Sequence, residues 1–140
     1  MYATAMKMIR LTAICGAVAV VTGAFGAHSL KDIFERNHLD TAKLLAIYEK
    51  GVYYQFFHTL ALGLSGVLAF RLPDSKWLPR AGWLFFSGIV LFSGSLYVLA
   101  CRELLPFSVT WIGPVTPLGG LCFIAGWLAL LLATREKISG

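Results

Sequence analysis

One histidine interrupts an otherwise apolar part of this 140-residue chain. His58 lies in the run Tyr54-Gln55-Phe56-Phe57-His58, and no other Asp, Glu, Lys, Arg or His lies well inside the long uncharged stretches. Hydrocarbon penalises polar groups, so an ionisable residue within a membrane span indicates either a partner or a functional site. Such a histidine could hydrogen-bond to another helix, bind a ligand, relay a proton or coordinate a metal.

Gln55 lies three residues before His58, so both side chains share one helix face and predict a polar strip that turns inward. Ser95 and Tyr97 in the next apolar stretch, and Thr116 near the start of the last, are candidate partners. We expect either interhelical hydrogen bonds, each worth about 0.6 kcal/mol, or a small polar cavity that binds a ligand. These five residues are therefore candidate ligand-binding residues.

His28 is a further candidate, because it ends the first apolar stretch. It is either a capping or interfacial histidine or a ligand to a metal or a lipid headgroup. If the hydrocarbon begins near Ala27 and Gly51, His58 lies about 10 Å deeper than His28, so joint metal or haem ligation is not expected. The stretches contain no carboxylate pair, nucleophile with a base, or zinc motif. The sequence therefore predicts no metal, no cofactor and no enzyme.

Composition indicates a membrane protein. Hydrophobic residues make up 58% of the chain and charged residues 14%, with a mean hydropathy of +0.74, whereas soluble domains carry about 25% charged residues. Uncharged stretches run over Leu11–Ala27, Gly51–Phe70, Ala81–Cys101 and Val109–Thr134, and about 20 residues cross the hydrocarbon. We predict an all-α membrane protein: one domain over 1–140, with a bundle of four transmembrane helices at about 8–27, 41–70, 78–101 and 117–134.

Basic residues predict the orientation of this bundle. One side would hold both termini and the loop between the second and third helices, with Lys7, Arg10, Arg71, Lys76, Arg80, Arg135 and Lys137. The other side would hold Lys31, Arg36, Lys43, Lys50 and Arg102. The positive-inside rule then predicts cytoplasmic termini. The formal charge of +5 is attributed to topology, so we expect the lipid bilayer and not a nucleic acid as partner.

Small residues predict close packing of helices. The first stretch, with its basic flank, also fits a cleaved signal peptide, and this alternative stays open. Against it, Gly16, Ala19, Gly23 and Gly26 recur every three to four residues and lay small side chains on one helix face. We expect helix-packing roles for six glycines, namely Gly16, Gly23, Gly26, Gly94, Gly119 and Gly120.

The first connection predicts a short amphipathic helix at the membrane surface, because Leu30, Ile33 and Phe34 fall at helical spacing opposite charged residues. The second helix should be capped at residue 40 or 41. A helix from there to residue 70 exceeds the hydrocarbon thickness, so it must project or tilt, and Gly51 is the expected bend.

The last helix has a sharp predicted start, with Thr116 as N-cap and Pro117 at the first helical position. Residues 104–115 should then be non-helical. Unpaired backbone is not tolerated in lipid, so this segment should lie in the interface or form a shallow re-entrant turn, anchored by Trp111.

Four motifs along the chain resemble one known family. They are GAFGAHSLK at 23–31, YQFFH at 54–58, GSLY at 94–97 and GPVTPLGG at 113–120. Together they resemble domain-of-unknown-function family 423, small four-span membrane proteins of bacteria with relatives in animals. The resemblance covers the whole chain in order. It implies a protein of the bacterial inner membrane and no established biochemical activity.

Three functional hypotheses follow. The first is a non-catalytic membrane protein that packs in or assists a membrane assembly, with a membrane-protein partner or as a homo-oligomer, through its small-residue faces. The alternative is a small transporter or ligand-binding protein with His58 and Gln55 lining the site. The least supported is an enzyme that acts on lipid at the outer face with His28 as base.

Overall fold

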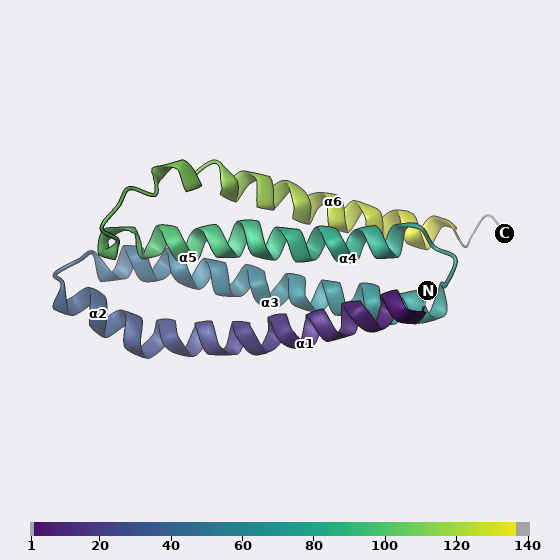
Figure 1. The fold of residues 1–140 in the computed structure, drawn as a ribbon, viewed down its shortest axis with the longest axis horizontal. Helices are drawn as coiled ribbons and strands as arrows, with labels where there is room; N and C mark the ends of the chain where they lie inside the picture. Colours follow the sequence, from purple (N-terminus) through teal and green to yellow (C-terminus); the bar gives the residue numbers. More distant parts are fainter. Residues whose placement is uncertain (1, 137–140) are drawn as a thin grey trace.

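Helices account for all regular secondary structure in residues 2–136, the part of the chain that the computed structural model describes. They form four rods that lie side by side (Figure 1). The first rod is α1 (Tyr2–Phe25), the π-helical turn η1 (Gly26–Leu30) and α2 (Lys31–Arg36), and the second is α3 (Thr41–Arg71). The third is α4 (Trp77–Gly88), the π-helical turn η2 (Ile89–Ser93) and α5 (Gly94–Ala100), and the fourth is α6 (Val115–Glu136).

Three helical runs within residues 2–136 are long and apolar enough to cross a membrane, Ala3–Arg36, Trp77–Ala100 and Thr110–Glu136. The fourth long helix, α3, has 31 residues but carries Gln55 and His58 in its apolar half, and these lower its hydropathy. The expectation of an all-α protein with membrane-spanning helices is confirmed. The number of candidate spans among the described residues is three.

The rods form a row. α3 packs against α1 on one side and against α4 and α5 on the other, and α6 packs against α4 and η2. α1 and α6 therefore lie at opposite edges (Figure 1). The two ends of the described chain and the loop at 72–76 lie at one end of the rods. α2 and the connection at 101–114 lie at the other end of the rods. The two groups of basic residues in the sequence are separated in this way, except that Lys137 lies outside the described residues.

The short amphipathic helix expected after the first helix is present as α2, but it is not separate from α1. Helical structure continues from α1 through η1 into α2 without a break. Leu30 and Phe34 are buried and pack with Leu44, Tyr48 and Ala100 in a small core cluster. The apolar face of α2 thus contacts α3 and the end of α5, because a protein surface of matching shape lies nearer than the lipid. Its other face carries the exposed i,i+4 ion pairs Lys31–Glu35 at 3.8 Å and Arg36–Asp32 at 3.9 Å.

α3 continues without a break through Gly51, where a bend was expected. This glycine makes room for the ring of Tyr97, since a Cβ there would lie 2.9 Å from a ring carbon. The start of α3 follows the sequence prediction, because Asp40 accepts a hydrogen bond from the backbone N–H of Lys43 at 3.2 Å.

The last helix begins at Val115, two residues before the predicted start, so Pro117 lies in its first turn, where the missing N–H costs little. Thr116 is therefore not its N-cap. The preceding segment is irregular, as expected, apart from two 3-10 turns, η3 (Arg102–Leu104) and η4 (Thr110–Ile112). Neither π-helical turn was predicted. The larger core cluster joins all four rods, with Met8, Leu62, Phe85 and Phe123 among its members.

Candidate functional site

Gln55 joins three helices. Its Nε2 donates to the carbonyl oxygen of Cys15 on α1 at 2.9 Å, and its Oε1 accepts a hydrogen bond from the hydroxyl of Tyr97 on α5 at 2.6 Å. The Gln55 residue is 3% exposed. A buried polar group without partners costs about 1–3 kcal/mol. These two bonds therefore favour one register of α1, α3 and α5.

Two tyrosines extend this network toward the end of α1. The Tyr97 hydroxyl lies 3.5 Å from Oγ1 of Thr22, and the Tyr48 hydroxyl donates to the Thr22 carbonyl at 3.0 Å. The rings of Tyr48 and Tyr97 are tilted against each other with centroids 4.8 Å apart. A Cβ on Gly26 would lie 2.6 Å from the Tyr48 ring. The motif glycine Gly26 thus allows the Tyr48 ring to lie against the first rod where η1 begins.

His58 uses both ring nitrogens. Nδ1 lies 2.8 Å from the carbonyl oxygen of Tyr54, one turn earlier on α3, and Nε2 accepts from the indole N–H of Trp127 on α6 at 3.3 Å. A carbonyl only accepts and an indole N–H only donates, so the proton must be on Nδ1 and Nε2 must be bare. This arrangement holds a neutral imidazole. Protonation of Nε2 would break the bond to Trp127.

Aromatic rings surround His58. Its imidazole stacks on Phe123 with centroids 3.5 Å apart at 12°, while Phe85 and Trp127 contribute tilted or edge contacts at 5.9 and 6.2 Å. Tyr54, one turn earlier on α3, stacks with Phe92, and the two ring centroids are 4.4 Å apart. The neutral ring is therefore packed as an aromatic side chain. We use the name polar seam for the hydrogen-bonded set Thr22, Tyr48, Gln55, His58, Tyr97 and Trp127.

The structure changes the expected partners of His58. Ser95, Tyr97 and Thr116 were the predicted partners, but Trp127 takes this place. The signal that could have found it is the indole N–H itself. Trp127 is 47% exposed on the surface of the chain, and in hydrocarbon its N–H has no water to bond to and so favours an acceptor within the protein. A helical wheel alone could not choose Trp127, since 69 residues separate it from His58.

The other candidate residues fall into separate places. Ser95 and Thr116 meet each other, with Oγ and Oγ1 2.7 Å apart across α5 and α6, and Ser95 also donates to the Phe92 carbonyl at 2.8 Å. His28 is exposed on η1. The structure thus brings together Gln55 with Tyr97, and Ser95 with Thr116. The described residues contain no group of three His, Cys, Asp or Glu side chains that could hold a metal ion.

The predicted packing glycines differ in how closely they are approached. A Cβ on Gly119 would collide with the backbone nitrogen of Phe92, so α6 and η2 touch backbone to backbone there. Gly23 is also tight, since its Cβ would lie 3.4 Å from Val52. Gly16 and Gly120 have room for a methyl group, with the nearest neighbour at 3.8 Å. Gly94 has no atom within 4 Å of an added Cβ, so it makes no close packing contact with the described chain.

Two buried hydroxyls have no hydrogen-bond partner within residues 2–136, Oγ1 of Thr59 and Oγ of Ser93. Thr59 lies one turn after Gln55 on α3, and Ser93 lies one turn before Tyr97 on the third rod. The two rods run in opposite directions (Figure 1), so both steps lead the same way from the Gln55–Tyr97 bond. The two unpartnered hydroxyls therefore lie at similar depth, one turn from the Gln55–Tyr97 bond.

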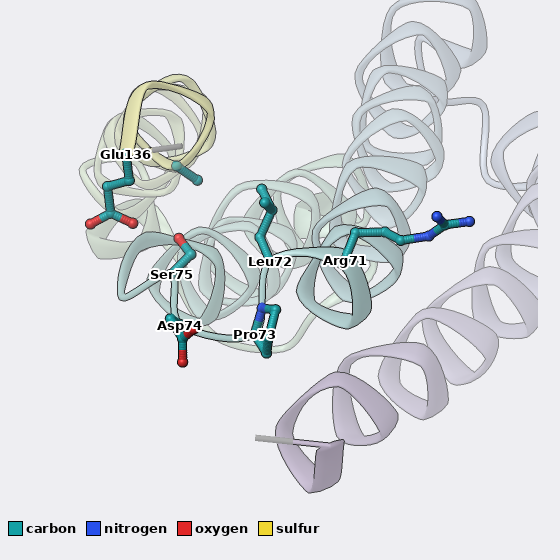
Figure 2. A pocket seen from close by; sticks show the side chains of 7 residues that line it. Arg71, Leu72, Pro73, Asp74, Ser75 and Glu136 are labelled. Atoms are coloured by element: carbon teal, nitrogen blue, oxygen red, sulfur yellow. The ribbon is translucent and has the colours of Figure 1, made fainter. Parts of the chain in front are cut away.

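Two cavities lie at opposite ends of the rods. One, of ≈ 310 Å³, is lined by the loop after α3 and by the end of α6. Figure 2 shows Asp74 and Glu136 on one side of it, with the guanidinium of Arg71 pointing away from both carboxylates. The other, of ≈ 420 Å³, lies beyond the end of α5 and is lined by residues of the 99–110 segment. Neither is lined by Gln55 or His58.

Comparison with known proteins yields one consistent family. A model described as "Protein of unknown function (DUF423)" matches residues 22–120. A UPF0382 membrane protein of Staphylococcus haemolyticus is 42% identical over 95% of this chain and 99% of its own length. A UPF0382 inner membrane protein of Escherichia coli is 39% identical over 98% of this chain and 96% of its own length. No solved structure shows a significant match.

Proposed function

The chain belongs to the DUF423 family of proteins of unknown function, and from this premise we propose that it is a non-catalytic, four-span protein of the bacterial inner membrane that packs in or assists a membrane assembly. The observation that carries the proposal is that the polar seam is internally paired. Both ring nitrogens of His58 and both polar atoms of Gln55 have protein partners. A catalytic or ligand-binding group would need a free atom directed at the substrate.

The distribution of side chains along α3 supports its role as the fourth span. Its polar residues Gln55, His58, Thr59 and Ser65 are buried against the other rods. Its opposite face exposes large apolar and aromatic side chains, including Tyr53, Phe57, Leu60, Leu64 and Val67. A helix with polar groups inside and apolar groups outside suits the hydrocarbon even when its mean hydropathy is modest.

Cytoplasmic termini are part of this proposal. Lys7, Arg10 and Arg80 lie on the parts of α1 and α4 toward the end of the rods where the described chain begins and ends. The guanidinium of Arg80 lies 4.8 Å from the ring centre of Trp77. Tryptophan and arginine at the end of a span suit the headgroup region. Fusion of a reporter active only in the cytoplasm to the C-terminus tests the orientation, and an inactive fusion in intact cells would contradict it.

A groove on the third rod offers a surface for the assembly. Gly94 lies in an apolar groove of ≈ 160 Å³ whose other residues include Val90, Val98 and Trp111. Small residues let a second helix approach closely in a membrane. A Cβ at Gly94 has no atom of the described chain within 4 Å, so a larger side chain there can extend into the groove.

Gly94→Leu tests the assembly role. Native gel electrophoresis of gently solubilised membranes should show a complex larger than one chain, and this complex should be lost in Gly94→Leu. The control is Ala17→Leu, which places the same side chain at an exposed position of α1. Gly23→Leu is less suitable because Val52 lies close enough for the fold itself to change. A wild-type protein that migrates as a single chain would contradict the proposal.

A ligand-binding or transport role is the second candidate, and the unpartnered hydroxyls favour it. A buried hydroxyl with no hydrogen bond costs about 1–3 kcal/mol, and Thr59 and Ser93 both lie beside the polar seam. A small polar ligand that reached either hydroxyl would supply its missing partner. Binding of such a ligand should then depend on these two hydroxyls more than on Gln55 or His58, whose polar atoms already have protein partners.

A further inference from the structure

The cavity beyond α5 contains chemistry that the polar seam does not use. Its volume of ≈ 420 Å³ is in the range of about 300–1,000 Å³ typical of small-molecule sites. Arg102 and Glu103 from η3 line it together with the hydroxyl residues Ser108 and Thr110. The apolar part of the lining includes Leu99. One cavity thus offers a cation, an anion, two hydroxyls and an apolar wall.

The cavity lies at the depth of lipid headgroups. The candidate span Trp77–Ala100 ends two residues before Arg102, which is about 3 Å of helical rise. Phe107 in the lining is 63% exposed, and the neighbouring Trp111 is 70% exposed. Exposed aromatic rings beside the end of a span are typical of the boundary between hydrocarbon and headgroups. A lipid headgroup can therefore reach this cavity while its chains stay in the bilayer.

The charges in the lining are of both signs. Nη2 of Arg102 lies 3.5 Å from Oε1 of Glu103, and both side chains are partly exposed. A guanidinium has several N–H donors in a planar fork, so this one contact leaves donors that suit a phosphate. Oγ of Ser108 and Oγ1 of Thr110 are 3.1 Å apart, and only one hydroxyl hydrogen is needed for their bond. The other hydroxyl can donate to a ligand.

We propose that this cavity binds the headgroup of a zwitterionic phospholipid with a primary ammonium group, a phosphoethanolamine lipid in chemical class. Arg102 and a hydroxyl of Ser108 or Thr110 donate to the phosphate oxygens, and the carboxylate of Glu103 accepts an N–H from the ammonium. A purely anionic headgroup would leave Glu103 beside a second negative charge. A trimethylammonium headgroup has no N–H to donate. Leu99 and Phe107 contact the apolar part of the lipid.

The other cavity, lined by the loop after α3 and the end of α6, lacks this arrangement. Its two carboxylates, Asp74 and Glu136, lie on one side while the guanidinium of Arg71 points away (Figure 2). A phosphate beside these two carboxylates would be repelled, and the guanidinium of Arg71 is not directed at the same place. The proposed recognition is therefore specific to the end that carries η3.

Native mass spectrometry of the full chain tests the proposal, with delipidated protein titrated with three lipids of identical acyl chains. The phosphoethanolamine lipid should bind at least about tenfold more tightly than the phosphoglycerol or the phosphocholine lipid. Arg102→Gln and Glu103→Gln should each weaken its binding by about tenfold, the factor that corresponds to one charge-assisted hydrogen bond. Arg36→Gln is the matched control, because it removes a guanidinium from an exposed ion pair on α2, which lies at the same end of the rods as η3.

Four outcomes would overturn the proposal. These are equal affinity for the three lipids, preference for the phosphoglycerol lipid, unchanged affinity in Arg102→Gln, and equal loss in Arg36→Gln. Water-soluble phosphoethanolamine forms a separate arm. If it displaces the lipid at matched concentration, the natural ligand is soluble and the assignment to a lipid is wrong. If it does not, the apolar wall contributes to binding, as expected for a membrane ligand.

Discussion

The hydroxyl of Tyr97 and the side-chain carbonyl of Gln55 meet at 2.6 Å across the interface of α3 and α5. The same glutamine reaches the backbone of α1 through its Nε2, so one side chain holds three rods in register. In hydrocarbon, no water competes for these groups, which makes their pairing decisive for how the helices are rotated. This relationship is the basis of the first prediction.

Removal of the Tyr97 hydroxyl should destabilise the fold. Tyr97→Phe leaves Oε1 of Gln55 buried without its donor, and we expect a loss of about 1 kcal/mol in the free energy of unfolding. Reversible unfolding in mixed detergent micelles measures this loss. Tyr53→Phe is the control, since its ring is exposed on α3, the helix that carries Gln55. An equal change in both variants would contradict the role of the Tyr97–Gln55 bond.

His58 should be a neutral imidazole with its proton on Nδ1. Nitrogen chemical shifts of the labelled histidine in lipid bilayers report the tautomer directly. Trp127→Phe removes the donor to Nε2 and should cost about 0.6 to 1.7 kcal/mol in unfolding free energy, while the exposed Trp83 serves as control. A proton found on Nε2 in the wild-type protein would show that the bond from Trp127 is absent.

Two adjacent glycines should respond in opposite ways to one added methyl group. In Gly119→Ala the new Cβ collides with the backbone of Phe92, which cannot rotate away, so we expect a loss of about 1–3 kcal/mol. In Gly120→Ala the nearest atom lies at 3.8 Å, and the better helix propensity of alanine should add up to about 1 kcal/mol. Thermal unfolding of the pair measures both. Equal stability would contradict the close contact of α6 with η2.

The unpartnered hydroxyls separate the two candidate functions. Without a ligand, Thr59→Val and Ser93→Ala remove a buried cost and should raise the free energy of unfolding by about 1 kcal/mol each. Ser65→Ala is the control, because its hydroxyl donates to the Ala61 carbonyl at 2.9 Å and its removal brings no such gain. A loss of stability in the first two variants, reversed by delipidation or dialysis, would instead favour a bound ligand.

Local features of the structure could be predicted from neighbouring residues alone. The cap at Asp40 and the breaks between the rods depend on short-range chemistry, and the sequence indicates them within a few residues. The predicted surface helix and the predicted bend at Gly51 both left out contacts that the structure shows. Each was argued from the properties of one helix in lipid, whereas the neighbouring helix supplied a better environment, the small core cluster for Phe34 and the ring of Tyr97 for Gly51.

The sequence by itself determined that this is a helical membrane protein of a known family and that Gln55 and His58 are its main polar groups inside the apolar stretches. Only the tertiary structure decided their partners, Tyr97 and Cys15 for Gln55 and Trp127 for His58. Hydrophobic periodicity indicates which face of a helix is polar. Which residues meet across an interface depends on the rotation of each helix about its axis and on the register between the two helices. Those are set by close approaches such as that of Gly119 to Phe92, which exist only once the helices have packed.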